Sequence, residues 1–149
     1  MNVFKFLLIL LGFISYGLPA IAQCDGGSVQ TSDGQTTVYT CPGDSMPDVL
    51  SFQHSTSTPD VSYAYVITDT NGVILGLPPA NEQNFEGAGP GTCLVWGLAY
   101  TGSITAMPGD TATAINLSDG CFDLSDNVIT VIRDMPDGGT VSTAEGDTL

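Results

Sequence analysis

The chain has 149 residues, of which 16 are Asp or Glu and only two are Lys or Arg, so its formal net charge at pH 7 is −14. Nucleic acids and anionic lipid surfaces are bound largely through Lys and Arg side chains, so this composition argues against both as partners. A strongly negative surface favours solubility and attracts cations.

The first 22 residues have the pattern of a signal peptide. A single positive charge precedes the apolar run at residues 6–14, which is too short to span a bilayer. Residues 20–22 have the small–x–small pattern of a cleavage site, so we expect cleavage after Ala22. Gln23 argues against lipid attachment to Cys24. The mature chain is thus predicted to be secreted, without a membrane span, and of a length that suits one domain.

The mature chain begins with strand signals. Residues 29–31 and 36–40 flank Asp33-Gly34, a dipeptide typical of tight turns, and this pattern predicts a β-hairpin. Residues 49–52 form a short apolar segment, and residues 54–59 are predicted to be a Ser/Thr loop.

The middle of the chain contains the clearest hairpin signal. Residues 63–67 alternate aromatic and small side chains, and Asn71-Gly72 then leads into the apolar residues 73–75. Asn-Gly favours the two positive φ angles of a type I′ turn, so we expect a two-residue hairpin loop here.

The last part of the chain contains two further strand signals between long connections. Residues 93–100 carry apolar side chains on both faces, which predicts a central strand buried on both sides. Short strands are expected near residues 84–86 and 113–117, and residues 128–133 form the last strand. About seven short strands without helical periodicity predict an all-β fold, an immunoglobulin-like β-sandwich.

All four cysteines, Cys24, Cys41, Cys93 and Cys121, follow the cleavage site. An even number of cysteines in an exported chain predicts two disulfides. Three connectivities are possible, and the sequence does not choose between them. We prefer Cys24–Cys41, because this pair flanks the first hairpin signal, together with Cys93–Cys121.

The end of the chain repeats its beginning. Residues 24–34 align without gaps with residues 136–146, and six of the eleven pairs are identical. The identical pairs include the Asp-Gly-Gly of residues 25–27 and 137–139. The sequence therefore predicts a module at residues 24–135, followed at 136–149 by the opening of a second copy, which indicates descent from an array of repeats.

Several short motifs together resemble a known repeat module. They are Cys24-Asp25-Gly26-Gly27, Cys41-Pro42-Gly43-Asp44, Tyr65-Val66-Ile67-Thr68-Asp69, Asn71-Gly72-Val73-Ile74-Leu75-Gly76, the glycine-rich segment 85–93, Trp96-Gly97-Leu98, Cys121-Phe122-Asp123-Leu124-Ser125 and Val128-Ile129-Thr130-Val131. The chain resembles a tandem-repeat module of large secreted, adhesin-like surface proteins of gliding and marine Gram-negative bacteria. The resemblance implies an extracellular surface role and carries over no catalytic residues.

Two motifs are candidates for chemical sites. Gly43-Asp44-Ser45 is similar to the nucleophile block of one esterase superfamily, but the only available base is His54, and a turn is the preferred interpretation. Asp119, Asp123 and Asp126 surround Cys121, and such a group of oxygens could bind Ca²⁺ in a flexible loop. No catalytic residue and no certain cofactor are predicted.

The sequence therefore favours a secreted surface or adhesion-type module without enzymatic activity. One alternative is a self-assembling filament subunit, in which the tail strand at residues 139–142 pairs with a sheet edge of the next molecule. Another is a glycan-binding module, in which Tyr63 and Tyr65 line a ligand face rather than the core. The expected partners are other surface proteins, copies of the chain itself or extracellular glycans.

Overall fold

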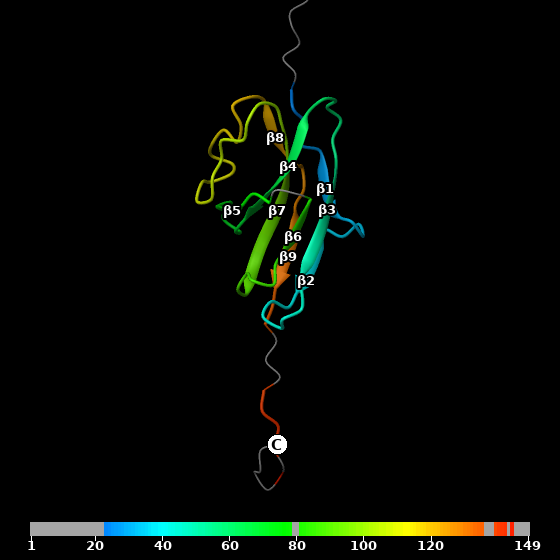
Figure 1. Ribbon diagram of the computed structural model, residues 1–149, viewed down its shortest axis with the longest axis vertical. Helices are drawn as coiled ribbons and strands as arrows, with labels where there is room; N and C mark the ends of the chain where they lie inside the picture. The colour runs from blue at the N-terminus through cyan, green and yellow to red at the C-terminus, as the bar shows by residue number, and fades with distance from the viewer. Residues whose placement is uncertain (1–22, 79–80, 136–138, 143, 145–149) are drawn as a thin grey trace, which may run out of the picture.

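The computed structural model describes residues 23–78, 81–135, 139–142 and 144 (Figure 1). The predicted signal peptide and most of the tail repeat lie outside these residues. The described residues form nine strands and no helix, which confirms the all-β prediction, and they contain no helix that could cross a membrane. The strands are β1 (Ser28–Thr31), β2 (Thr37–Thr40), β3 (Val49–Ser55), β4 (Ser62–Thr68), β5 (Ile74–Gly76), β6 (Glu82–Asn84), β7 (Gly91–Tyr100), β8 (Phe122–Leu124) and β9 (Ile129–Arg133).

The strands are arranged in two sheets. The smaller sheet has the order β1-β3-β6, and the larger has the order β2-β9-β7-β4-β5. Strand β8 pairs with β7 at Leu98–Tyr100, beyond the stretch of β7 that pairs with β9. One edge of the long β7 therefore carries β9 and β8 in succession, while its other edge carries β4.

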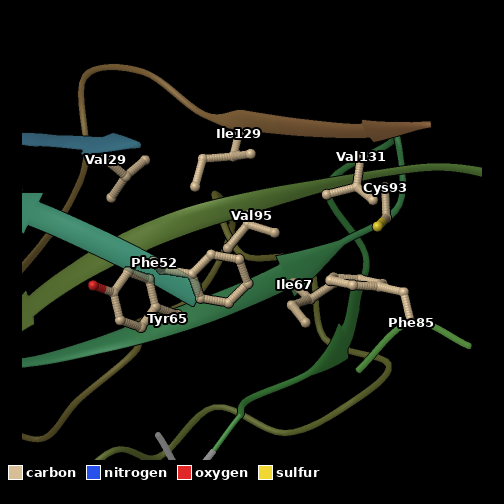
Figure 2. Close-up of a cluster of buried hydrophobic side chains, with 9 residues drawn as sticks. All are labelled: Val29, Phe52, Tyr65, Ile67, Phe85, Cys93, Val95, Ile129 and Val131. Carbon is tan, nitrogen blue, oxygen red and sulfur yellow. The ribbon is translucent and has the colours of Figure 1, made fainter. Parts of the chain in front are cut away.

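One hydrophobic cluster joins the two sheets. Val29 and Phe52 come from the smaller sheet and Phe85 follows its β6, whereas Tyr65, Ile67, Cys93, Val95, Ile129 and Val131 come from the larger sheet (Figure 2). These side chains occupy alternate positions of their strands, because successive residues of a strand point to opposite faces. The facing sheets are thus held together by burial of apolar surface.

The outer face of the larger sheet carries a second cluster. Val66 and Leu98 pack there against Ala106, Ala112 and Leu117 of the connection between β7 and β8. The prediction that residues 93–100 form a central strand buried on both sides is confirmed. The predicted strand at residues 113–117 is absent, because this connection instead lies over the sheet and forms only isolated bridges such as Ile104–Ser118.

The predicted hairpin at Asp33-Gly34 is wrong, although the turn itself forms. Gly34 has a positive φ of 84° and its amide donates to the carbonyl oxygen of Thr31 at 2.9 Å. Strand β1 then pairs antiparallel with β3, and β2 pairs parallel with β9. The chain changes sheets at this turn, and both strands satisfy backbone groups of β3 and β9 that a local hairpin would leave unpaired.

The predicted disulfide pairing is also wrong. The structure contains one disulfide, Cys24–Cys121, with a Cα–Cα distance of 5.8 Å, while Cys41 and Cys93 are free. Without the hairpin, Cys41 is carried beside the end of β9, because Thr40 is aligned with Arg133. The start of the described chain lies at the opposite end of the molecule (Figure 1).

The second predicted hairpin, β4–β5, is confirmed with a different turn. Gly72 has a φ of 82°, but Asn71 is not among the residues with positive φ, so the turn is not type I′. The Oδ1 of Asp69 accepts hydrogen bonds from the amides of Asn71 at 2.8 Å and Val73 at 2.9 Å. The carboxylate of Asp69 thus stabilises this turn through side-chain hydrogen bonds, and two residues in the left-handed region are not required.

Candidate functional site

A cleft of about 730 Å³ opens at the side of the molecule between β3 and β4, which belong to different sheets. Strand β6 pairs with β3 only at Val49–Ser51, and β5 pairs with β4 only at Ile67 and Thr68. Among the described residues, no strand pairs with β3 beyond Ser51 or with β4 before Ile67 on this side, although the amide of Phe52 still donates to the carbonyl oxygen of Asn81 at 2.7 Å. The cleft, which we call the aromatic cleft, is lined by Phe52, Gln53, His54, Tyr63, Ala64, Tyr65, Leu77, Pro78, Asn81, Tyr100 and Ile104.

Four aromatic rings fill the wall of the aromatic cleft. The rings of His54 and Tyr63 are stacked, with centroids 3.5 Å apart and planes 6° from parallel. The Nδ1 atom of His54 lies 3.1 Å from the hydroxyl of Tyr65, whose ring is 5.1 Å from that of Phe52. Because Phe52 and His54 are two residues apart on β3, they point to the same side as Tyr63 and Tyr65 of β4. The aromatic cleft is therefore the open end of the core between the sheets.

The aromatic residues differ in how far they are exposed. Tyr65 is only 4% exposed and belongs to the core cluster, Tyr63 is half-buried, and His54 is exposed. Burial raises the pKa of the Tyr63 and Tyr65 hydroxyls above the usual 10.0. Although the His54 residue as a whole is exposed, its ring is stacked on Tyr63, and this partial desolvation lowers the pKa of His54 below 6.5. All three side chains are consequently neutral at pH 7. Tyr65 therefore belongs to the core, and Tyr63 packs against it. Both residues also line the aromatic cleft, and the interpretation of this face as a ligand face stays a prediction.

Tyr63 also contacts the first residues of the predicted mature chain. Its hydroxyl donates a 2.7 Å hydrogen bond to the carbonyl oxygen of Gly26. A β-carbon on Gly26 would lie 2.1 Å from the carbonyl oxygen of Leu124, and one on Gly27 would lie 1.7 Å from that of Ser55. The opening segment therefore occupies a slot between β3 and β8 that admits only glycine at these two positions.

Asp25 fixes the opening segment in this slot. Its carboxylate accepts hydrogen bonds from the amides of Gly27 and Ser57, each at 3.0 Å, and from the Ser57 hydroxyl. These hydrogen bonds, with that of the Ser57 hydroxyl first, lower the pKa of Asp25 below its usual 3.8. We call residues 24–27 with these contacts and the disulfide to Cys121 the opening clasp. The Asp-Gly-Gly of residues 25–27 thus has a structural explanation, because each of the three residues makes or permits a particular contact.

The structure separates the residues of the considered esterase motif. Ser45 has a φ of 68° and its amide donates a 2.8 Å hydrogen bond to Oε1 of Glu86, whereas His54 contacts Tyr63 and Tyr65. The Gly43-Asp44-Ser45 segment thus forms a turn before the start of β3, in agreement with the preferred interpretation.

The proposed calcium ligands are likewise not brought together. Asp123 accepts from the amide of Gly26 at 3.0 Å, and Asp119 accepts from the amide of Ser103 at 2.6 Å. Asp126 contributes its backbone amide, which donates to the carbonyl oxygen of Gly27. Among the described residues, no three His, Cys, Asp or Glu side chains are grouped so that they could hold a metal ion.

Sequence reasoning missed several residues of the aromatic cleft. His54 was assigned to a loop but lies on β3, and Gln53, Asn81 and Tyr100 were not considered as site residues. The two-residue spacing of Phe52 and His54 was an available signal that β3 continues past Phe52. That β3 and β4 together line one cleft, in contrast, depends on how the strands of the two sheets pair.

Comparisons with protein family models, with curated proteins and with solved structures gave no match to this chain. Its function must therefore be inferred from its own residues.

Proposed function

We propose that this protein is a secreted surface module of the adhesion type, which provides structure and binding contacts rather than catalysis. We infer that the fold is immunoglobulin-like from the order of the strands in the two sheets. The order β9-β7-β4-β5 corresponds to the G-F-C-C′ sheet of such domains, and β1-β3-β6 corresponds to A-B-E. The transfer of the chain from β1 in one sheet to β2 beside β9 in the other supports this assignment.

The observation that carries the proposal is the placement of the two ends of the module. The described chain begins at one end of the long axis, and β9 finishes at the other (Figure 1). A module built in this way can be followed directly by another along the same axis, as in an array of repeats. Arrays of this kind extend binding surfaces away from a cell.

The opening clasp supports the same proposal. Its slot requires glycine at residues 26 and 27 and uses the carboxylate of Asp25. The sequence Asp137-Gly138-Gly139 supplies the same three residues directly after the module. A following module would need these three residues to form an opening clasp of its own.

Surface labelling tests this proposal. Intact cells that produce the protein, and their culture medium, would be probed with an antibody against residues 24–135 before and after external protease treatment. We expect the protein in the medium or at the cell surface, where protease removes it. Confinement to the cytoplasm would overturn the proposal. So would turnover of a substrate that is lost in both His54→Gln and Ser45→Ala.

The aromatic cleft favours glycan binding as a second candidate function. Aromatic rings offer apolar faces to the C–H groups of sugars, and the amides of Gln53 and Asn81 lie beside them as hydrogen-bonding groups. The net charge of −14 favours neutral polysaccharides over acidic ones.

A glycan array of environmental polysaccharides tests this candidate. We expect neutral glycans to bind the wild type and to bind Tyr100→Leu and Asn81→Ala more weakly by about tenfold or more. Tyr39→Leu is the matched control, because Tyr39 is 72% exposed on β2 and outside the aromatic cleft. A blank array, or equal losses in the control, would reject glycan binding at this cleft and leave the proposed surface location unaffected.

A further inference from the structure

A second pocket lies on the other side of the Leu77–Pro78 segment, which lines both hollows. Its volume is about 360 Å³. This value falls near the lower end of the range of about 300–1,000 Å³ that is usual for small-molecule sites. The walls are largely apolar, with contributions from Ile67, Leu75, Phe85 and Ala88. We call it the Arg133 pocket, since this residue supplies its charge.

Arg133 is the only Lys or Arg among the described residues, because the other, Lys5, belongs to residues 1–22. It follows Ile129 and Val131 at alternate positions of β9, so it continues the row of side chains that faces the core. Its guanidinium therefore reaches the Arg133 pocket from the end of the core cluster, next to Cys93. In Figure 2, Cys93 and Phe85 lie at the same end of that cluster.

The groups around this guanidinium do not neutralise it. One of its terminal nitrogens, Nη1, donates a hydrogen bond to the carbonyl oxygen of Gly89. The Nε atom is buried and has no hydrogen-bond partner in the described structure. Buried polar atoms are normally paired, so this Nε atom marks an incompletely satisfied group at the pocket.

Cys93 does not supply a negative charge either. Burial raises the pKa of its thiol above 9.0, and this effect outweighs the neighbouring Arg133, which acts in the opposite direction. The thiol is therefore neutral at pH 7. A partly desolvated cation with only neutral partners is unfavourable, and an anionic group placed against it would remove that cost.

We propose that the Arg133 pocket binds a small amphiphilic carboxylate, with the carboxylate on the guanidinium of Arg133 and the hydrocarbon against Ile67, Leu75 and Phe85. A carboxylate fits because guanidinium groups bind it through paired hydrogen bonds. A single guanidinium in a chain of net charge −14 disfavours ligands with several negative charges. The apolar walls require a hydrocarbon part, and the volume restricts its size.

Calorimetric titration of the full, disulfide-bonded chain with octanoate tests this inference. Octanamide is the matched ligand, because it has the same chain length without the charge. We expect octanoate to bind and octanamide to bind more weakly by about tenfold or more. We expect Arg133→Gln to weaken octanoate binding by a similar factor, and Arg133→Lys to retain part of it. Tyr100→Leu should bind octanoate as the wild type does, because Tyr100 lines the aromatic cleft and not the Arg133 pocket.

A second measurement avoids dependence on folding of the Arg133 variants. In a Cys41→Ser background, Cys93 is the only free thiol, and octanoate should slow its reaction with N-ethylmaleimide whereas octanamide should not. The inference is overturned if octanoate does not bind the wild type, if octanamide binds equally well, or if folded Arg133→Gln binds octanoate as the wild type does. None of these results would bear on the surface location or on glycan binding at the aromatic cleft.

Discussion

Gly97 lies directly beneath the side chain of Tyr63. A β-carbon on Gly97 would sit 1.9 Å from the Tyr63 hydroxyl oxygen and 2.7 Å from Cζ. The absence of a side chain on β7 thus lets Tyr63 extend across the sheet to the carbonyl oxygen of Gly26. One glycine on the central strand therefore connects the aromatic cleft to the opening clasp.

We expect Gly97→Ala to destabilise the fold by about 2 kcal/mol, since the added methyl group must displace a well-packed side chain. Denaturant unfolding would measure the loss. Gly76→Ala is the control, because Gly76 also lies on a strand but has open space around it, and a change of less than about 0.5 kcal/mol is expected there. Equal effects of the two substitutions would show that Tyr63 does not depend on Gly97.

The single disulfide predicts a definite thiol count. In the native chain one thiol reagent molecule should react rapidly at exposed Cys41, and buried Cys93 should react only slowly until the chain is denatured. Cys24 and Cys121 are 97 residues apart, so Cys24→Ser with Cys121→Ser should cost about 4.7 kcal/mol in the chain-entropy description. Cys41→Ser should change stability little. Detection of a Cys24–Cys41 or Cys93–Cys121 bridge by peptide mapping would contradict this pairing.

Asn127 is expected to stabilise the edge of β1. Its Oδ1 accepts from the amide of Val29 at 2.9 Å, and its Nδ2 donates to the carbonyl oxygen of the same residue at 2.8 Å. The side chain thus bonds β1 as a neighbouring strand would. Asn127→Ala should lower the free energy of unfolding by about 2 kcal/mol, and Asn127→Asp by at least as much, because it removes the donor. Substitution of exposed Asn116 by Ala is the control, and similar losses in both would refute the role of Asn127.

Stability should fall as the pH is lowered from about 7.5 to about 5.5. Partial desolvation of the His54 ring lowers its folded-state pKa below the ordinary 6.5, so the unfolded chain binds the proton more readily in this window. His54 is the only histidine, and His54→Gln should remove the slope. Unfolding measured at several pH values would show it, and an unchanged slope in the variant would contradict the assignment.

A separate decline is expected under more acidic conditions. Hydrogen bonds from Ser57 and Gly27 lower the pKa of Asp25 below 3.8, so its contribution is present above that value and is lost as the pH falls further. His54→Gln should retain this second decline, whereas Asp25→Asn should reduce it.

The local features of the fold could be predicted from the sequence. Alternating aromatic and small residues identified β4, and a stretch rich in Val and Ile identified β9. Apolar residues on both faces of residues 93–100 correctly marked β7 as the central strand. The turns at Gly34 and Gly72 were also found, because a positive φ is a local requirement that glycine meets. The recurrence of Asp-Gly-Gly was visible as a pattern, although its structural meaning was not.

Pairing between distant strands was decided only by the tertiary structure. A turn signal at Asp33-Gly34 does not reveal whether the chain folds back or crosses to the other sheet, and this choice fixed the position of Cys41 and the pairing of Cys24. The aromatic cleft and the Arg133 pocket exist because β5 and β6 are shorter than the strands they flank. Such sites depend on contacts across many intervening residues, whereas the sequence patterns used here report only on neighbours within a turn or a strand.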